Sequence, residues 1–376
     1  MAPHFDAPSP AVSYSSFSER IPSNLRPLVS SSLRSGSAES QTSLSSSFDD
    51  SSLEDVYAMA RPLVPGVYVP TVCFFDPETE DVDTKSIAQH AVRLAQAGVT
   101  GLATQGSNGE AVHLTRDERC LVTQTTRNAL NDAGFRHIPI IVGCGAQSTR
   151  EAIQLCRDAS KSGGDYALVL PPAYYASLFA PSSKTILDFF TAVADSSPIP
   201  LIIYNFPGAV NGMDLSSDLI VKLSQHQNIV GVKLTCGNTG KLNRVAAATR
   251  KLTKNYDPKR PEFLVLAGSA DFSIQSLAVG GHGILAGLAN IAPKACLKTI
   301  ELYGAGKYDD AQEMQDIVSQ GDWVAIQSGV IGVKSGLQSW LGYGGYARSP
   351  LPKPTAEQAN NWKEGFRELW SLEKAL

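Results

Sequence analysis

The sequence lacks features that mark several large classes of protein. Its 32 Lys and Arg residues are outnumbered by 36 Asp and Glu residues, so the net charge is −4 and no basic excess is available for nucleic acid. No apolar run approaches the length of a membrane span, and no hydrophobic stretch near the start resembles a secretory signal. We therefore expect neither a nucleic-acid-binding protein nor a membrane protein.

Metal-binding and disulfide patterns are missing as well. The six cysteines are scattered without a CxxC pair, and the six histidines show no HxxxH or HxH spacing. In a chain of 376 residues without a secretory signal, such cysteines predict reduced thiols in an intracellular protein. The histidine spacing gives no support to a metal site, although distant ligands could still meet in the fold.

The first part of the chain differs from the rest in composition. About a third of residues 1–53 are serine, and no apolar periodicity is present. Such a segment buries too little apolar surface to offset the entropy of ordering it, so residues 1–62 are predicted to be a disordered leader. We expect an unstructured tail of a cytoplasmic protein. The alternative is a mitochondrial presequence, which the serines and Arg20, Arg26 and Arg34 would suit, although acidic residues are interspersed.

Beyond the leader, short apolar runs rich in β-branched residues recur between Gly, Pro and Asn. They are nearly continuous rather than alternating, as expected for strands that are buried on both faces. The eight predicted strands span residues 66–75, 99–105, 138–144, 166–172, 200–206, 229–235, 263–269 and 281–287.

Helical patterns lie between these runs. Thr115 with Glu118, and Ser148 with Glu151, have the spacing of a capping box at the start of a helix. The predicted helices of this part span residues 84–98, 115–130, 148–163 and 214–227.

Eight strands separated by helices predict a parallel (β/α)8 barrel, the TIM barrel, over residues 63–300. A doubly wound sheet is the alternative, but eight units over about 240 residues fit the usual size of the barrel more closely. Residues 301–376 carry helical patterns without intervening strands, which predicts a C-terminal helical appendage.

Two reactive side chains stand near the C-terminal ends of neighbouring predicted strands, where barrels of this type place their active sites. Lys233 lies in the apolar run "IVGVKLT", and Tyr204 ends the preceding run. Burial of an amine favours its neutral form, which attacks ketones to give a Schiff base, and a phenol can move protons in such a reaction. The alternatives are a lysine that extends to a carboxylate at the strand end and a tyrosine that only packs.

Two further segments follow predicted strands at the same end of the barrel. The turn "GSNGE" (106–110) offers backbone N–H groups with Ser107 and Asn108, which suits a carboxylate because the turn has no Lys or Arg. Glu110 is interpreted as a residue that stabilises this turn. The pair Tyr174–Tyr175 is interpreted as a contributor to the crevice, to a subunit contact, or to packing alone.

These segments, together with "LAGSAD" and "GHGILAGLAN", resemble the dihydrodipicolinate synthase / N-acetylneuraminate lyase family of class I aldolases over residues 64–355. Within that family the chain is similar to the 4-hydroxy-2-oxoglutarate and 2-keto-3-deoxy-sugar-acid aldolases. The resemblance implies that Lys233 forms a Schiff base with a 2-keto acid and that Tyr204 transfers protons. It also implies pocket or interface roles for other residues, a homotetramer, and no cofactor. The residues concerned are Ser107 and Asn108 at the keto-acid carboxylate, Thr235 and Gly268 in the pocket wall, and Tyr174 at a subunit interface.

One departure from the family pattern bears on the substrate. Dihydrodipicolinate synthases carry an arginine five residues after the proton-transferring tyrosine, where this chain has Ala209. Without that guanidinium the site lacks a bidentate clamp for a second carboxylate. We therefore expect an aldolase that cleaves a 4-hydroxy-2-keto acid to pyruvate and an aldehyde. The alternatives are a 4-hydroxy-tetrahydrodipicolinate synthase and a catalytically silent barrel that binds a keto acid.

Overall fold

The computed structural model describes residues 61–179, 183–256 and 262–376. Eight parallel strands close into a barrel in sequence order, with β1 paired to both β2 and β8. This confirms the predicted TIM barrel. The strands are β1 (Gly66–Pro70), β2 (Gly101–Thr104), β3 (Ile140–Gly143), β4 (Tyr166–Val169), β5 (Leu201–Asn205), β6 (Ile229–Leu234), β7 (Leu264–Ala267) and β8 (Gly283–Leu285).

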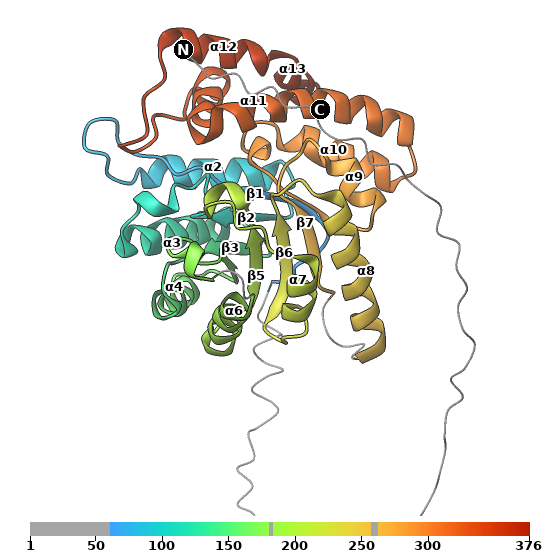
Figure 1. Ribbon diagram of the computed structural model, residues 1–376. Coiled ribbons are helices and arrows are strands. Elements are labelled where there is room, and N and C mark those ends of the chain that lie inside the picture. The colour runs from blue at the N-terminus through green and yellow to red at the C-terminus, as the bar shows by residue number, and fades with distance from the viewer. Residues whose placement is uncertain (1–60, 180–182, 257–261) are drawn as a thin grey trace, which may run out of the picture. The chain divides into compact units, whose positions relative to one another are not determined.

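Helices surround the strands, and a further group of helices gathers on one side of the barrel (Figure 1). Those that alternate with the strands are α2 (Thr84–Gln96), α3 (Arg116–Asp132), α4 (Thr149–Lys161), α5 (Ala176–Phe179), α6 (Lys184–Ser196), α7 (Ser217–Leu223), α8 (Thr239–Tyr256), α9 (Ser273–Ala278) and α10 (Pro293–Gly304). The C-terminal group consists of α11 (Tyr308–Leu341), α12 (Ala356–Gly365) and α13 (Arg367–Ala375). None of the helices in the described ranges is long and apolar enough to cross a membrane.

Most predicted elements are longer than the observed ones, and the differences are largest in two of them. The strand predicted over 66–75 ends at Pro70, because Asn290 accepts a hydrogen bond from Val72 N (3.2 Å) and donates one to Pro70 O (2.9 Å) in place of a neighbouring strand. The helix predicted over 214–227 is the shorter α7, which begins after the capping side chain of Ser216. At α3 the predicted capping box forms between Thr115 and Glu118.

Alternation along the strands explains the continuous apolar runs. One set of side chains, which includes Leu168, Ile202 and Leu266, fills the inside of the barrel, while the other set packs against the surrounding helices. Because both faces of the sheet are buried, neither needs polar residues.

The N-terminal end of the barrel is closed by the chain that enters β1. The Tyr166 hydroxyl donates to Arg61 O (2.7 Å), and the Arg61 guanidinium forms an ion pair with Asp165 (2.7 Å). Arg61 therefore belongs to the folded barrel, although the sequence placed it in the leader; residues 1–60 lie outside the described ranges. With this end closed, the C-terminal ends of the strands are where a ligand could enter.

The C-terminal helices are connected directly to the barrel. Lys334 of α11 lies beside Glu110, the last residue of the predicted "GSNGE" turn, and Asp322 of α11 accepts hydrogen bonds from Ala270 N (2.6 Å) and Asp271 N (3.0 Å) after β7. Burial raises the pKa of Asp322 to about 7, with a further contribution from Asp271. The C-terminal segment thus supports two loops at the mouth of the barrel.

Candidate active site

Lys233 and Tyr204 lie side by side inside the barrel. They are register partners on β6 and β5, and both are almost fully buried, at 4% and 3% exposed. Lys233 Nζ lies 4.2 Å from the centroid of the Tyr204 ring, so the amine contacts the face of the phenol. On the other side, the register partner of Lys233 is the apolar Leu266 of β7.

No carboxylate accompanies this lysine in the described part of the chain. Neither an ion pair nor a hydrogen bond engages Lys233 Nζ there, which argues against the alternative of a lysine paired at the strand end. A buried amine that contacts an aromatic ring near the C-terminal end of its strand is chemically suited to attack a carbonyl carbon.

The turn after β2 reaches across the mouth to the same tyrosine. Ser107 is exposed, and its Oγ lies 3.4 Å from Tyr204 Oη. Two residues in the left-handed region, Gln105 (φ 55°) and Glu110 (φ 51°), bracket the turn and direct it over the barrel. The phenol, the hydroxyl of the turn and the amine therefore form one continuous polar group in an otherwise apolar interior.

Two glycines make room for the other predicted pocket residues. A Cβ atom on Gly268 would lie 2.0 Å from Thr235 Oγ1, and one on Gly287 would lie 2.4 Å from Asn108 Nδ2. At Gly268 only glycine permits the approach, because its Cβ would also meet the Thr235 backbone at 2.6 Å; at Gly287 a larger residue would displace the Asn108 side chain. The structure thus brings Thr235 against Gly268, and Asn108 against the residues that follow β8. Thr235 Oγ1 is buried and has no hydrogen-bond partner among the described residues, so it is available to a ligand.

Tyr174 is the predicted site residue that the structure does not bring into this group. Its side chain is 76% exposed, and its ring packs edge-on against Tyr175 at 4.9 Å between centroids. Gln147 holds the segment by accepting from Ala173 N and Tyr174 N, both at 2.9 Å. An exposed, backbone-anchored aromatic pair is compatible with a contact between subunits.

Two features of the site escaped sequence reasoning. Phe206, the first residue after β5, stacks on Tyr204 at 5.8 Å between ring centroids. Glu110 is anchored by residues more than 200 positions away, since its carboxylate accepts from Lys334 Nζ (3.1 Å) and Arg348 N (2.9 Å). The role of Glu110 in stabilising the turn was predicted, but its partners had no local signal.

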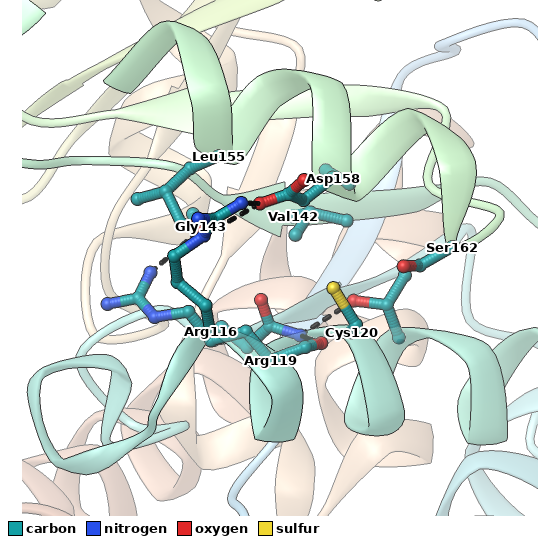
Figure 2. A pocket seen from close by; sticks show the side chains of 11 residues that line it. Arg116, Arg119, Cys120, Val142, Gly143, Leu155, Asp158 and Ser162 are labelled. Atoms are coloured by element: carbon teal, nitrogen blue, oxygen red, sulfur yellow. Dashed lines mark hydrogen bonds and ion pairs between the residues drawn. The ribbon is translucent and has the colours of Figure 1, made fainter. Parts of the chain in front are cut away.

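A small cavity lies between α3 and α4, beside the end of β3 (Figure 2). Its volume of about 10 Å³ is the space of roughly one water molecule. Arg119 donates from this wall to Gly143 O (3.3 Å) and Ala111 O (2.6 Å), and the neighbouring Arg116 pairs with Asp158 (2.6 Å). This cavity is too small for a substrate; Arg119 supports the end of β3 and the residue after the "GSNGE" turn, while Arg116 links α3 to α4.

In the described ranges, no group of three or more His, Cys, Asp or Glu side chains is placed to hold a metal ion. The polar groups at the mouth are the amine, the phenol, two hydroxyls and an amide. Such donors suit an uncharged carbonyl group with a neighbouring carboxylate better than they suit a cation.

Comparison with known proteins agrees with this geometry. The sequence profile of the dihydrodipicolinate synthetase family matches residues 64–368, which is most of the chain. The chain belongs to this family.

The chain matches two curated fungal relatives over nearly the whole length of each relative. The chain is 55% identical to the Emericella nidulans protein named "Probable 4-hydroxy-2-oxoglutarate aldolase, mitochondrial", over 84% of this chain and 98% of that protein. It is 49% identical to the L-threo-3-deoxy-hexylosonate aldolase of Aspergillus niger, again over 84% and 98%. Among solved structures, YagE of E. coli K12 in complex with pyruvate is similar, with a TM-score of 0.73 and 25% identity over 82% of this chain and 99% of that one.

Proposed function

We propose that this protein is a Schiff-base-forming aldolase that cleaves a 4-hydroxy-2-keto acid to pyruvate and an aldehyde. One observation carries the proposal: a buried lysine without a carboxylate partner in the described chain lies 4.2 Å from the ring of a tyrosine whose hydroxyl meets the Ser107 turn. The fungal relatives named as aldolases for a five-carbon and a six-carbon acid of this type support the substrate class.

The covalent step belongs to Lys233. Its amine adds to the C2 carbonyl carbon of the keto acid, and loss of water gives a protonated imine. The positive nitrogen then accepts the electron pair of the C3–C4 bond when that bond breaks. An aldehyde leaves, and an enamine of pyruvate remains on Lys233. Protonation at C3 and hydrolysis of the imine release pyruvate and restore the amine.

Tyr204 moves the protons in this scheme. Its hydroxyl gives its proton to the departing water when the imine forms, and the resulting phenolate takes the proton from the C4 hydroxyl group as the C3–C4 bond breaks. Ser107 Oγ lies 3.4 Å from Tyr204 Oη, where it can orient or relay that proton. Ser107 and Asn108 hold the carboxylate of the pyruvyl half, which places C2 over Lys233. Thr235 and Gly268 form the adjoining wall, where the Thr235 hydroxyl, which has no hydrogen-bond partner among the described residues, gains a ligand.

Borohydride trapping with pyruvate tests the proposal directly. We expect a reduced pyruvyl adduct on Lys233 of the wild-type protein, located by peptide mass spectrometry, and none on Lys233→Met. Lys251→Met, which changes an exposed lysine of α8, is the matched control and should trap normally. Adduct formation in Lys233→Met would refute the assignment, and the absence of an adduct on the wild type would favour the catalytically silent barrel.

A substrate panel decides which aldehyde is released. The two acids to compare first are 4-hydroxy-2-oxoglutarate, which gives glyoxylate, and a 3-deoxy-2-hexulosonate, which gives glyceraldehyde. Aspartate semialdehyde with pyruvate tests the alternative condensation. Ala209 is exposed on the short helix η2 (Pro207–Ala209) and supplies no guanidinium, so we expect no synthase activity.

The assembly and the compartment have separate tests. A homotetramer would cover the exposed Tyr174 and Val112, which are 76% and 89% exposed, and light scattering measures it. The name of the Emericella relative favours the mitochondrial alternative over the cytoplasm. Fusion of residues 1–60 to a fluorescent protein, followed by imaging in cells, would distinguish the two compartments.

A further inference from the structure

A closed loop of eight residues follows β5 at the mouth of the barrel. Its base is joined by Asn205, whose side chain donates to Asp214 Oδ1 (2.8 Å) and accepts from Leu215 N (2.9 Å). The Asn205 carbonyl also accepts from Thr235 N (2.9 Å), so the same residue fixes the end of β5 against β6. Residues 206–213 thus form a loop that leaves and returns to one point beside Tyr204.

Lys241 of α8 locks this base from outside. It is buried, at 4% exposed, and its ammonium group donates to Asp214 Oδ1, the same oxygen that accepts from Asn205. Burial alone would raise the pKa of Asp214, but the hydrogen bonds from Lys241 and Asn205 outweigh it, so the pKa lies below its ordinary value. Asp214 is therefore a charged carboxylate throughout the neutral range and keeps Lys241 as its partner.

The loop touches the reactive tyrosine at its first residue. The Phe206 ring stacks on Tyr204 with an interplanar angle of 21°. A Cβ on Gly208 would lie 3.1 Å from the Phe206 ring. Farther along, Asn211 adopts a left-handed conformation (φ 53°) and donates to Ala173 O (2.8 Å), which ties the loop to the segment after β4. A shift of the loop would therefore move Phe206, which is one of the neighbours that position the Tyr204 ring, together with Lys233.

The loop is held by packing in part, since Val210 is buried and Met213 packs against the core, but another side of it borders a groove. A groove of about 750 Å³ lies between it and helices α5 and α6, lined in part by Asn211, Met213 and Leu219. Where the groove borders the loop in the described part of the chain, polar contacts supply positioning that tight packing would otherwise give.

From these contacts we infer that Lys241, acting through Asp214 and Asn205, is a positioning residue for the aldehyde half of the reaction. This inference rests on the proposed aldolase function. The pyruvyl half of the substrate lies at Lys233, Ser107 and Thr235, whereas the leaving aldehyde lies beyond the Tyr204 hydroxyl, where the loop 206–213 begins. Loosening the loop should therefore impair cleavage and change substrate selectivity while imine formation with pyruvate continues.

Lys241→Met tests the inference with Lys251→Met as the matched control on the same helix. Hydrogen exchange of the loop amides, among them Ala209 and Gly212, should be at least tenfold faster in Lys241→Met than in wild type or the control. Trapping with pyruvate alone should stay within twofold of wild type. The kcat for cleavage of 4-hydroxy-2-oxoglutarate should fall about tenfold or more, since small misplacements are costly to reaction geometry. The kcat/KM ratio between this acid and a 3-deoxy-2-hexulosonate should also change by more than threefold.

Three results would overturn the inference: unchanged exchange of the loop amides, unchanged cleavage and selectivity, or a loss of trapping in proportion to the loss of cleavage. If Lys241→Met does not fold, Asp214→Asn is the second variant, because the Asp214 side chain is 44% exposed and tolerates substitution better. Absence of a pyruvate adduct on the wild type would instead refute the proposed function, and the exchange data would still decide whether Lys241 holds the loop.

Discussion

The tripeptide Gly-Val-Lys occurs twice in this chain, and its two lysines have different surroundings. Lys233 lies on β6 and Lys334 lies on α11, and both are nearly inaccessible to solvent. Each amine also lies over an aromatic ring, Tyr204 at 4.2 Å and Phe75 at 4.7 Å. Burial and aromatic contact therefore do not distinguish the lysine proposed to react from one that is held by a carboxylate.

The partners of the amine make the difference. Lys334 donates to Glu110 (3.1 Å) and to Tyr346 O, and its pKa is lowered by burial although Glu110 acts in the opposite direction. Lys233 has no such partner in the described ranges. An amine held by a carboxylate and a carbonyl has its donors occupied, whereas an amine without them is available for chemistry. The carboxylate, rather than the degree of burial, marks the structural lysine.

Removing the amine of Lys233 should have the largest effect on activity. We expect Lys233→Met to lower kcat/KM for cleavage by more than about 10³-fold, because the covalent intermediate can no longer form. The unfolding free energy should change little, since a chain of similar volume replaces an amine that has no described partner. Steady-state pyruvate release and urea unfolding measure the two quantities. A large loss of stability with retained activity would show that Lys233 is the structural lysine.

The same substitution at Lys334 should act on stability instead. Lys334→Met leaves the Glu110 carboxylate buried without its countercharge, which costs about 3–5 kcal/mol of unfolding free energy. The double variant with Glu110→Gln should recover part of that loss, because no buried charge then remains. Urea unfolding of the two single variants and the double variant completes a cycle. Equal stability of Lys334→Met and wild type would show that the pair does not anchor the turn.

Tyr204→Phe separates proton transfer from packing. The phenyl ring keeps the stacking on Phe206, so we expect stability to change by less than about 1 kcal/mol. Without the hydroxyl, cleavage should fall by about 10²-fold or more, while an adduct with pyruvate still forms on longer incubation. Single-turnover cleavage and time-resolved trapping provide the measurements. Full activity in this variant would move the proton-transfer role to another group.

The sequence was sufficient to predict the part of the site that depends on the barrel pattern. Lys233 and Tyr204 follow from two apolar runs whose strands are neighbours, because a (β/α)8 barrel places consecutive strands side by side. Ser107 and Asn108 follow in the same way from a strand that ends in a Gly-rich turn. These residues come together through regular secondary structure, and regular structure leaves a periodic signal.

The parts that could not be predicted depend on contacts between distant segments. Nothing near Lys334 in the sequence distinguishes it from Lys233, since both follow Gly-Val in an apolar stretch. Its pairing with Glu110 spans 224 positions and depends on where α11 crosses the barrel. Likewise, Lys241 becomes informative only once Asp214 and Asn205 are placed beside it. Such pairs are specified by three-dimensional packing, which a single sequence does not display.

A more exposed pair in the same region should show the smallest effect and a pH dependence. Arg348, whose backbone N donates to Glu110, also binds Glu118 through its guanidinium at 2.6 and 2.9 Å. The hydrogen bonds from Arg348 are the main cause that lowers the pKa of Glu118 to about 2. Because this folded-state pKa lies below the ordinary value of 4.5, the ion pair stabilises the fold above about pH 4.5 and is lost as the pH falls toward 2.

Glu118→Gln should therefore be less stable than wild type at pH 7 by about 1 kcal/mol or less, since the partners are partly solvated. The difference should shrink to zero as the pH is lowered toward 2, because wild-type Glu118 then becomes neutral too. Thermal unfolding of both proteins at intervals from pH 7 to pH 2.5 measures the difference. A constant gap across that range would mean that Glu118 contributes through its cap on Thr115 rather than its charge. If Glu118→Gln lost as much unfolding free energy as Lys334→Met, the exposure of an ion pair would not determine how much it stabilises this part of the fold.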